Sequence, residues 1–428
     1  MTQNKSYALP IAMMFALFFM IAFVTGLPSP MGVIVAKQFG ASNFLSQLGF
    51  FANFIAYAFM GIPAGILLER IGYKKTALIA VVVGFSGVAV QYFSGQIGSF
   101  VIYLTGAFIS GFSMCMLNTV VNPMLNTLGG GGKKGNQLIQ TGGSLNSVAA
   151  TIVPVLVGYL MGANADERTI DKANPALFMA MGIFAIVFVV LYIMEIPEPR
   201  LIGKSKVKHE HSPLSFRHFI FGAIAIFVYV GIEIGIPSTA NLFMTSDIAK
   251  GGLAINATVA GSVVGTYWFL MMIGRILGAS FASRFTSKAM LSAVSVLGLV
   301  FVALAIFLPV STTVSMPVFQ SNISFGLANV PIGIMFLIFC GLCTSVMWGG
   351  IFNLAVEGLG KYTEAASGIF MVMVCGGGIL PLLQGKIADL TSYATSYWVI
   401  FVCIGYLLFY ALIGSKNVNK DIPVEVIG

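Results

Sequence analysis

Long apolar stretches constrain the fold of this chain more than any other feature. A helix that crosses a bilayer needs about 20 mostly apolar residues, and twelve such stretches follow one another along the sequence. They cover approximately residues 8–36, 45–69, 76–93, 98–126, 136–162, 174–195, 217–246, 254–283, 288–310, 328–355, 363–388 and 393–414. Because the stretches are continuous rather than alternating, they predict membrane-spanning helices and disfavour a barrel of strands.

Composition supports this interpretation. The chain is 58% hydrophobic and only 8% charged, whereas a soluble domain carries about 25% charged residues. We therefore expect an all-α integral membrane protein whose main partner is the lipid bilayer. No cluster of histidines, thiols or carboxylates suggests a catalytic centre or a metal site, so we expect neither an enzyme nor a resident cofactor.

The basic residues predict the orientation. Most of the 22 Lys and Arg residues fall in one set of loops or near the termini, and cytoplasmic loops carry such an excess. Both termini are then cytoplasmic, as in a multi-pass protein of a bacterial-type inner membrane. This asymmetry also accounts for the net charge of +8 without nucleic-acid binding. A polar linker over 197–213 separates two six-span halves, 1–196 and 214–428.

The two halves carry similar short elements at corresponding positions. Gly61 and Gly65 in the second span match Gly274 and Gly278 in the eighth, and Pro154 in the fifth span matches Pro381 in the eleventh. Such an echo predicts an internal duplication with a substrate site near the midplane, the layout of major facilitator transporters. We expect the glycine-rich and basic elements to act as gates between the halves: Gly65, Arg70, Lys75, Gly274, Arg275 and Arg284.

Glu233 is the one carboxylate deep inside a predicted span. A charge at the bilayer centre costs about 2.5–3.5 kcal/mol on insertion scales, so such residues usually bind a partner, a substrate or an ion. Pro237, four residues later, removes a helical hydrogen bond beside it. We therefore expect Glu233 to bind substrate or a coupling ion, although a purely structural buried pair is the alternative.

Further polar and aromatic side chains lie within the spans. Amides that bond hydroxyls, next to aromatic faces, suit a sugar, although amides in spans also hold helices together. The candidate substrate-binding residues of the first half are Asn118, Asn122, Gln140 and Asn146. Those of the second half are Tyr229, Glu233, Asn241, Trp268, Trp348 and Asn353.

Several stretches resemble a known family. The fucose/proton symporter family of the major facilitator superfamily has a fourth-span signature similar to Asn118-Thr-Val-Val-Asn-Pro123-Met-Leu-Asn-Thr-Leu-Gly129. Its tenth and eleventh spans resemble Ile351-Phe-Asn-Leu-Ala-Val-Glu-Gly-Leu-Gly360 and Gly376-Gly-Gly-Ile-Leu-Pro381-Leu-Leu-Gln-Gly385. Tyr229-Val-Gly-Ile-Glu233 is similar to the seventh span of its glucose/galactose transporter branch. The resemblance covers nearly the whole chain and implies twelve helices and sugar transport.

The chain also departs from that family. The symporters carry an aspartate in the first-span break and a glutamate before the fourth-span motif, and the matching residues here are Ser29 and Asn118. Gln140 matches a glutamine that the family associates with sugar. Glu233, with Ser29 as a carboxylate-free candidate, is then the expected site of ion coupling.

Together these observations predict a secondary active transporter that imports a sugar by alternating access. The substrate would be a hexose such as glucose or galactose, or a related fucose or amino sugar. The expected coupling ion is Na⁺ or H⁺, and the expected unit is a monomer. Two alternatives stay open at this stage, namely a sugar uniporter without ion coupling and a drug or metabolite exporter of the same fold.

Overall fold

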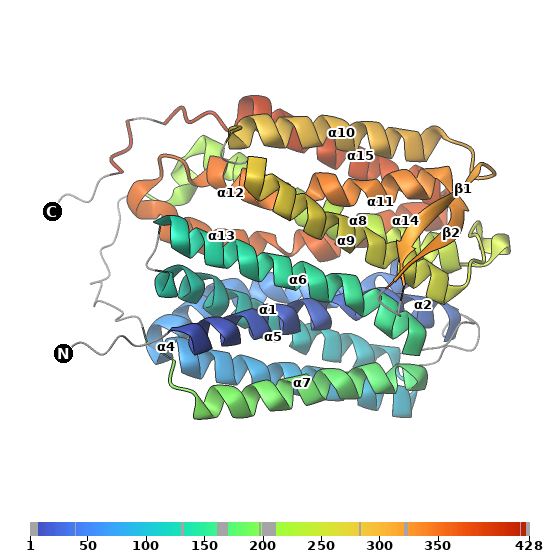
Figure 1. The fold of residues 1–428 in the computed structure, drawn as a ribbon, viewed down its shortest axis with the longest axis horizontal. Coiled ribbons are helices and arrows are strands. Elements are labelled where there is room, and N and C mark those ends of the chain that lie inside the picture. The colour runs from blue at the N-terminus through green and yellow to red at the C-terminus, as the bar shows by residue number, and fades with distance from the viewer. Residues whose placement is uncertain are drawn as a thin grey trace.

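The computed structural model describes residues 7–38, 40–129, 132–160, 170–196, 198, 211–281, 284–320, 324–419 and 421–424. Long helices run side by side along one direction, with the first half of the chain in the lower part of Figure 1 and the second half above it. The helices of the first half are α1 (Ala8–Gly26), α2 (Pro28–Gln38), α3 (Asn43–Ser46), α4 (Leu48–Ile97), α5 (Phe100–Leu128), α6 (Gly132–Leu160) and α7 (Asn174–Ile193).

The second half contains helices and one small sheet. Its helices are α8 (Arg217–Thr245), α9 (Ala257–Phe281), α10 (Ser287–Phe307), α11 (Ile332–Thr344), α12 (Met347–Val356), α13 (Thr363–Met373), α14 (Gly376–Leu390) and α15 (Tyr393–Phe409). Its strands are β1 (Thr313–Phe319) and β2 (Phe325–Pro331), which pair antiparallel. Most of the proposed linker, 199–210, lies outside the described residues.

The twelve-span prediction is confirmed. Within the described residues, eleven helical stretches are long and apolar enough to cross a membrane, and Thr141–Val157 of α6 is a shorter one. The beginning of α1 and the end of α15 lie at the same end of the bundle (Figure 1), as an even number of spans requires. We call the opposite end, where α2, α3 and the sheet lie, the far end.

Several spans are interrupted where the sequence weakens a helix. The first span divides into α1 and α2 at Leu27, directly before Pro28. The tenth divides into α11 and α12, and the eleventh divides into α13 and α14. Such interruptions at membrane depth are tolerated where neighbouring protein or water satisfies the backbone.

The sheet was not expected from the sequence and corrects two predictions. The protein is not purely helical, and the tenth span begins at Ile332 rather than at residue 328, because Ala328 to Pro331 belong to β2. The register pairs Thr313 with Pro331 and Phe319 with Phe325. The apolar residues of β2 continue into α11 without a polar break, so hydropathy alone could not separate strand from helix.

The second and third spans meet at Gly72. Its φ of +84° interrupts α4, and such a conformation favours glycine. The Glu198 carboxylate accepts hydrogen bonds from the N–H groups of Tyr73 and Lys74, at 2.8 and 3.0 Å. A Cβ atom on Gly72 would lie 2.7 Å from Glu198 Oε2. The carboxylate therefore caps the helix after Gly72 and ties it to the end of the sixth span.

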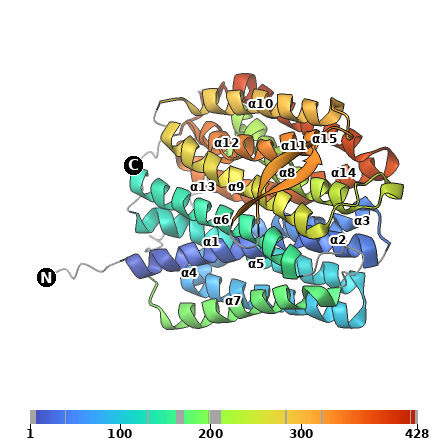
Figure 2. The same cartoon turned by 45° about the vertical axis from the view of Figure 1, so that its right-hand side comes forward.

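The two halves pack together along two pairs of helices. In Figures 1 and 2, α6 of the first half lies beside α9 of the second, and Gly265 of α9 lies close to the Thr151 backbone of α6. The first part of α4 packs against α13 and α14, where Gly378 approaches the backbone of Phe51. Glycines at these contacts let helix backbones approach closely, as is common between membrane helices.

The cap at Gly72 generates a stability prediction. Because hydrogen bonds to charged groups contribute about 1.5–3 kcal/mol and this carboxylate is exposed, we expect Glu198→Ala to lower the free energy of unfolding by about 1–2 kcal/mol. Thermal unfolding in detergent would measure the loss. Glu195→Ala, which removes an exposed carboxylate three residues away, is the control, and an equal loss in both variants would contradict the capping role.

Candidate functional site

Glu233 lies near the middle of α8, a helix whose side chains are mostly buried. Pro237 lies in the same helix and has no N–H to donate to the Glu233 carbonyl. The helical hydrogen bond that residue 237 would donate to the carbonyl of Glu233 is therefore missing. The Tyr397 hydroxyl, from α15, donates to the Ile236 carbonyl at 3.1 Å and holds the helix at this point.

The partner of Glu233 is Arg275 of α9. Arg275 Nη2 lies 3.6 Å from Glu233 Oε1, and the two side chains are 18% and 15% exposed. We call these two residues the central pair. Both side chains are therefore mostly buried, and a small part of each stays exposed. Sequence reasoning assigned Arg275 to a gate, although a second charge inside a span was a signal that it could pair with Glu233.

Arg275 also joins the two halves of the protein. Its Nη1 donates to the Gly143 carbonyl at 2.7 Å and to Ser147 Oγ at 2.6 Å, both on α6. One turn further along α6, the Thr151 hydroxyl donates to the Ser147 carbonyl. One guanidinium thus binds a carboxylate in its own half and neutral acceptors in the other half. The sequence did not indicate Gly143, because a backbone carbonyl acceptor has no side-chain signature.

Aromatic side chains surround the central pair. The ring of Tyr229, one turn before Glu233, lies 6.1 Å from that of Trp348. Its hydroxyl is buried and lies beside both charges. Tyr267 shares a hydrogen bond of 3.1 Å with Thr344, and its ring meets that of Trp268 edge to face. Hydroxyls beside aromatic faces are suited to a hydroxylated ligand.

Trp268 also contacts the first half of the chain. It packs against a small cluster formed by Ala22 of α1 and by Ala149 and Ala150 of α6. This contact places the Trp268 ring at the seam between the halves. Ala149 and Ala150 follow shortly after Ser147 on α6. Tyr229 and Trp348, two of the predicted substrate-binding residues, therefore lie beside the central pair, which contains a third, Glu233, and Trp268 lies at the seam between the halves.

Three of the predicted amides of the first half, those with described side chains, bond to protein. Asn118 Nδ2 donates to the Tyr57 hydroxyl and to the Met114 carbonyl. Asn122 donates to the Asn118 carbonyl, and Asn146 donates to the Phe18 carbonyl on α1 at 3.1 Å. These contacts support the helix-packing alternative for the amide N–H groups, and sugar binding by the three residues stays a prediction.

The other predicted site residues differ in their exposure. Asn353 is exposed on α12, and Asn241 is buried on α8 two turns beyond Glu233. Arg70, Lys75 and Arg284 are exposed. The side chains of Gln140 and Ser29 lie outside the described residues.

The two predicted gate glycines have different surroundings. A Cβ atom on Gly65 would meet nothing within 4 Å, whereas Gly274 packs against Ser345 of its own half. Their gating role stays a prediction.

A second set of contacts joins the halves at the far end. Asp389 of α14 accepts hydrogen bonds from the N–H groups of Asn43 and Phe44 at 2.8 and 2.9 Å. The Tyr393 hydroxyl lies 2.6 Å from Asn43 Oδ1 and 2.7 Å from Ser246 Oγ. We call these five residues the far-end contact. It fixes the start of α3 from the first half against α8, α14 and α15 of the second.

Between the two sets of contacts lies a third link. The buried Gln47, at the start of α4, donates to the hydroxyls of Ser238 and Thr239 on α8 at 3.3 and 3.4 Å. Both acceptors directly follow Pro237. Polar links between the halves therefore run from the far end along α8 toward Glu233.

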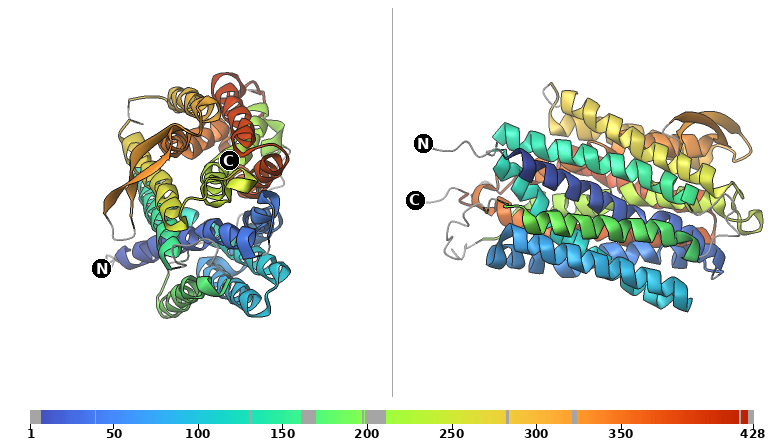
Figure 3. Two further views of the ribbon diagram at one scale, coloured as in Figure 1. Left: turned by 90° about the vertical axis from the view of Figure 1, so that its right-hand side faces the viewer. Right: turned by 60° about the horizontal axis from the view of Figure 1, so that its bottom comes forward.

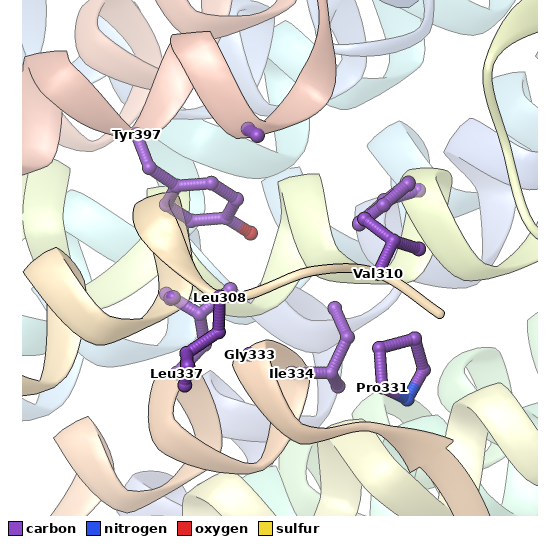
Figure 4. A pocket seen from close by; sticks show the side chains of 10 residues that line it. Leu308, Val310, Pro331, Gly333, Ile334, Leu337 and Tyr397 are labelled. Atoms are coloured by element: carbon purple, nitrogen blue, oxygen red, sulfur yellow. The ribbon is translucent and has the colours of Figure 1, made fainter. Parts of the chain in front are cut away.

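A small cavity near the far end does not fit a sugar. It lies among α8, α10, α11 and α15 and is lined by apolar side chains such as Leu308, Ile334 and Leu337 (Figure 4). Its volume of about 20 Å³ holds roughly one water molecule. The one hydroxyl on its wall, that of Tyr397, already donates to a backbone carbonyl.

The family follows from comparison with known proteins. The sequence profile of the Major Facilitator Superfamily matches residues 13–381. The chain belongs to the Major Facilitator Superfamily. It is therefore a multi-pass membrane transporter and not an enzyme, and the duplicated twelve-helix arrangement is the fold of this superfamily.

Individual superfamily members are similar over nearly the whole chain. The glucose/galactose transporter of Brucella abortus is 29% identical over 426 residues, covering 97% of this chain and 96% of that protein. The L-fucose-proton symporter of Escherichia coli is 24% identical, covering 98% and 96%. A crystal structure of the E. coli fucose:proton symporter superposes with a TM-score of 0.68 at 20% identity, covering 96% of this chain and 100% of that one.

The far-end contact predicts a conformational effect. Asp389→Asn weakens two charge-assisted hydrogen bonds between the halves, so we expect the far end to open more often. A reporter cysteine at Gln47, which is 1% exposed in the parent protein, should then react several-fold faster with a water-soluble maleimide. Asp421→Asn, at the other end of the bundle, should leave the labelling rate unchanged. Equal labelling rates with and without the Asp389→Asn substitution would rule out a closing role for this carboxylate.

Proposed function

We propose that this protein imports a sugar by alternating access and that a proton drives the uptake. The substrate class is a hexose such as glucose or galactose, or a related deoxy or amino sugar. The observation that carries the proposal is the central pair, a mostly buried carboxylate and guanidinium that lie where the halves meet. In this arrangement Glu233 carries the proton, so coupling needs no carboxylate at the positions of Ser29 and Asn118.

The relatives support the sugar. The Brucella protein is named a glucose/galactose transporter and the E. coli protein an L-fucose-proton symporter. The surroundings of the central pair fit such a ligand, since the Tyr229 hydroxyl, which lies beside both charges, can bond a sugar hydroxyl. The rings of Trp268 and Trp348 offer apolar faces to a sugar ring. None of these features favours the drug or metabolite exporter.

The central pair supports coupling to a proton. When Glu233 is ionised, it attracts a guanidinium that also binds α6. Protonation removes the carboxylate charge and with it the attraction to Arg275, leaving Arg275 with its neutral acceptors Gly143 and Ser147. The tie between α8 and the α6–α9 seam is then weaker, and Glu233 is free to bond a sugar hydroxyl. Proton binding thereby changes both the affinity for sugar and the contact between the halves.

The distribution of basic residues and the relatives support a location and an orientation for this protein. The basic loops and the bacterial relatives support a bacterial inner membrane with both termini in the cytoplasm. The far end of the bundle then faces outward. A single chain contains both halves and the central pair, so we propose that the transporter acts as a monomer.

Purified protein in proteoliposomes tests the substrate class. We expect saturable uptake of at least one labelled hexose, deoxyhexose or amino sugar, and accumulation above equilibrium under an inward proton gradient. Saturable uptake of none of these sugars would contradict the proposal. Accumulation under a sodium gradient alone would identify Na⁺ as the driving ion. Equal uptake with and without either gradient would identify a uniporter in which Arg275 is the permanent counter-ion of Glu233.

Glu233→Gln tests the carrier. This variant cannot release or bind a proton at position 233, so we expect loss of accumulation under a proton gradient. Exchange of labelled for unlabelled sugar across the membrane should persist, because exchange needs no net proton movement. Glu357→Gln, which changes an exposed carboxylate at the end of α12, should retain both activities. Full accumulation by Glu233→Gln would show that another group carries the ion.

A further inference from the structure

Gln384 of α14 has a fully buried amide without a partner. The residue is 0% exposed, and neither its Nε2 nor its Oε1 has a hydrogen-bond partner among the described residues. Most buried polar side-chain atoms in proteins are bonded. A glutamine amide carries two N–H donors and a carbonyl acceptor. Burying it without partners therefore destabilises this conformation relative to one in which water reaches the amide.

The amide of Gln384 lies against the backbone of α8. A Cβ atom on Gly235 would lie 2.2 Å from Gln384 Oε1 and 3.2 Å from the side chain of Ile400, so the glycine leaves room for the amide. Leu380, one turn earlier on α14, packs against Gly231 in the same way. The two glycines lie on one face of α8, because residues four apart share a face. Helix packing therefore places the amide here without supplying a polar partner.

Hydroxyls on the next turn of the same face of α8 already bond to other groups. Ser238 Oγ donates to the Gly235 carbonyl at 3.4 Å. Ser238 and Thr239 both accept from the amide of Gln47, which belongs to the first half. Two glutamines thus reach this part of α8, one from each half. Only the amide of Gln47 is bonded there.

Gln384 also lies at the seam between the halves. The left panel of Figure 3 looks onto the far end, with the first half below and the second half above. Gly377, seven residues before Gln384 and on the same side of α14, packs against both α8 and α4. Gly385, the next residue, packs against the backbone of Asn43 at the start of α3. Because α3 and α4 belong to the first half, their movement away from α14 opens a path for water to the amide.

We propose that Gln384 sets the balance between the conformations that are closed and open at the far end. While the far end is closed, the amide is buried without a partner, and this cost favours opening. When α3 and α4 leave α14, water hydrates the amide. The residue therefore acts against the far-end contact and favours return of the transporter to the open conformation. This role is independent of the substrate and of the coupling ion.

Two substitutions with opposite expected effects test this role. Gln384→Met removes the amide and keeps an unbranched side chain, so the far end should close more often. Gln384→Glu introduces a carboxyl group, whose charged form is harder to bury than an amide, so the far end should open more often. The reporter is Thr245→Cys, on the same face of α8 as Ser238 and 4% exposed in the parent protein. In nanodiscs without sugar, we expect a water-soluble maleimide to label it several-fold more slowly with Gln384→Met and several-fold faster with Gln384→Glu.

Gln91→Met is the matched control. It removes another buried amide, but one that donates to Ser110 within the first half, so the labelling rate should stay unchanged. The protein without the reporter, whose five cysteines are buried, gives the background. An unchanged or faster rate with Gln384→Met, or an unchanged or slower rate with Gln384→Glu, would overturn the proposal, because the side chain would then contribute packing alone. If Gln384→Met does not fold, Gln384→Leu makes the same comparison and the same outcomes decide.

Discussion

The rest of this structure depends on the interaction of Arg275 with Glu233 and α6. Either charge alone inside a span would cost several kcal/mol, and together they offset each other. The guanidinium does more than neutralise the carboxylate, because Gly143 and Ser147 belong to the other half of the protein. Arg275, which offsets the charge of Glu233 in the membrane, thus also holds the two halves together. We expect a change in the charge of Glu233 to be transmitted to that seam.

The links between the halves lie at different depths along the same helix. Ser246 belongs to the far-end contact, Ser238 and Thr239 bind Gln47 below it, and Glu233 binds Arg275 deeper still. All of them are polar, and glycines lie along the packed helix pairs between them. Polar links of this kind can be exchanged for water or for substrate at a small free-energy difference. Alternating access requires contacts that can form on one side of a site while they break on the other.

Much of the fold could be predicted from the sequence. Hydropathy located the spans, and the break before Pro28 was visible, whereas the interruption expected at Pro237 is absent because α8 continues through it. Glu233 was recognisable as a functional candidate because a lone carboxylate in a span is costly. The resemblance of the fourth, tenth and eleventh spans indicated the family that the comparison confirms. The hairpin was missed because its apolar strand β2 runs directly into α11. Arg275 was assigned to a gate, since its neighbours in the sequence belong to a repeated glycine-rich element.

By itself, the sequence determined the membrane environment, the number of helices and the duplication, because these depend on local composition and spacing. Only the tertiary structure decided which side chains meet. The pairing of Glu233 with Arg275, the acceptors on α6 and the capping of α3 by Asp389 join residues that are far apart in the chain. Such contacts depend on how helices pack and rotate against one another. Hydrophobicity along one helix does not specify that arrangement, because lipid and a neighbouring helix are similarly apolar partners.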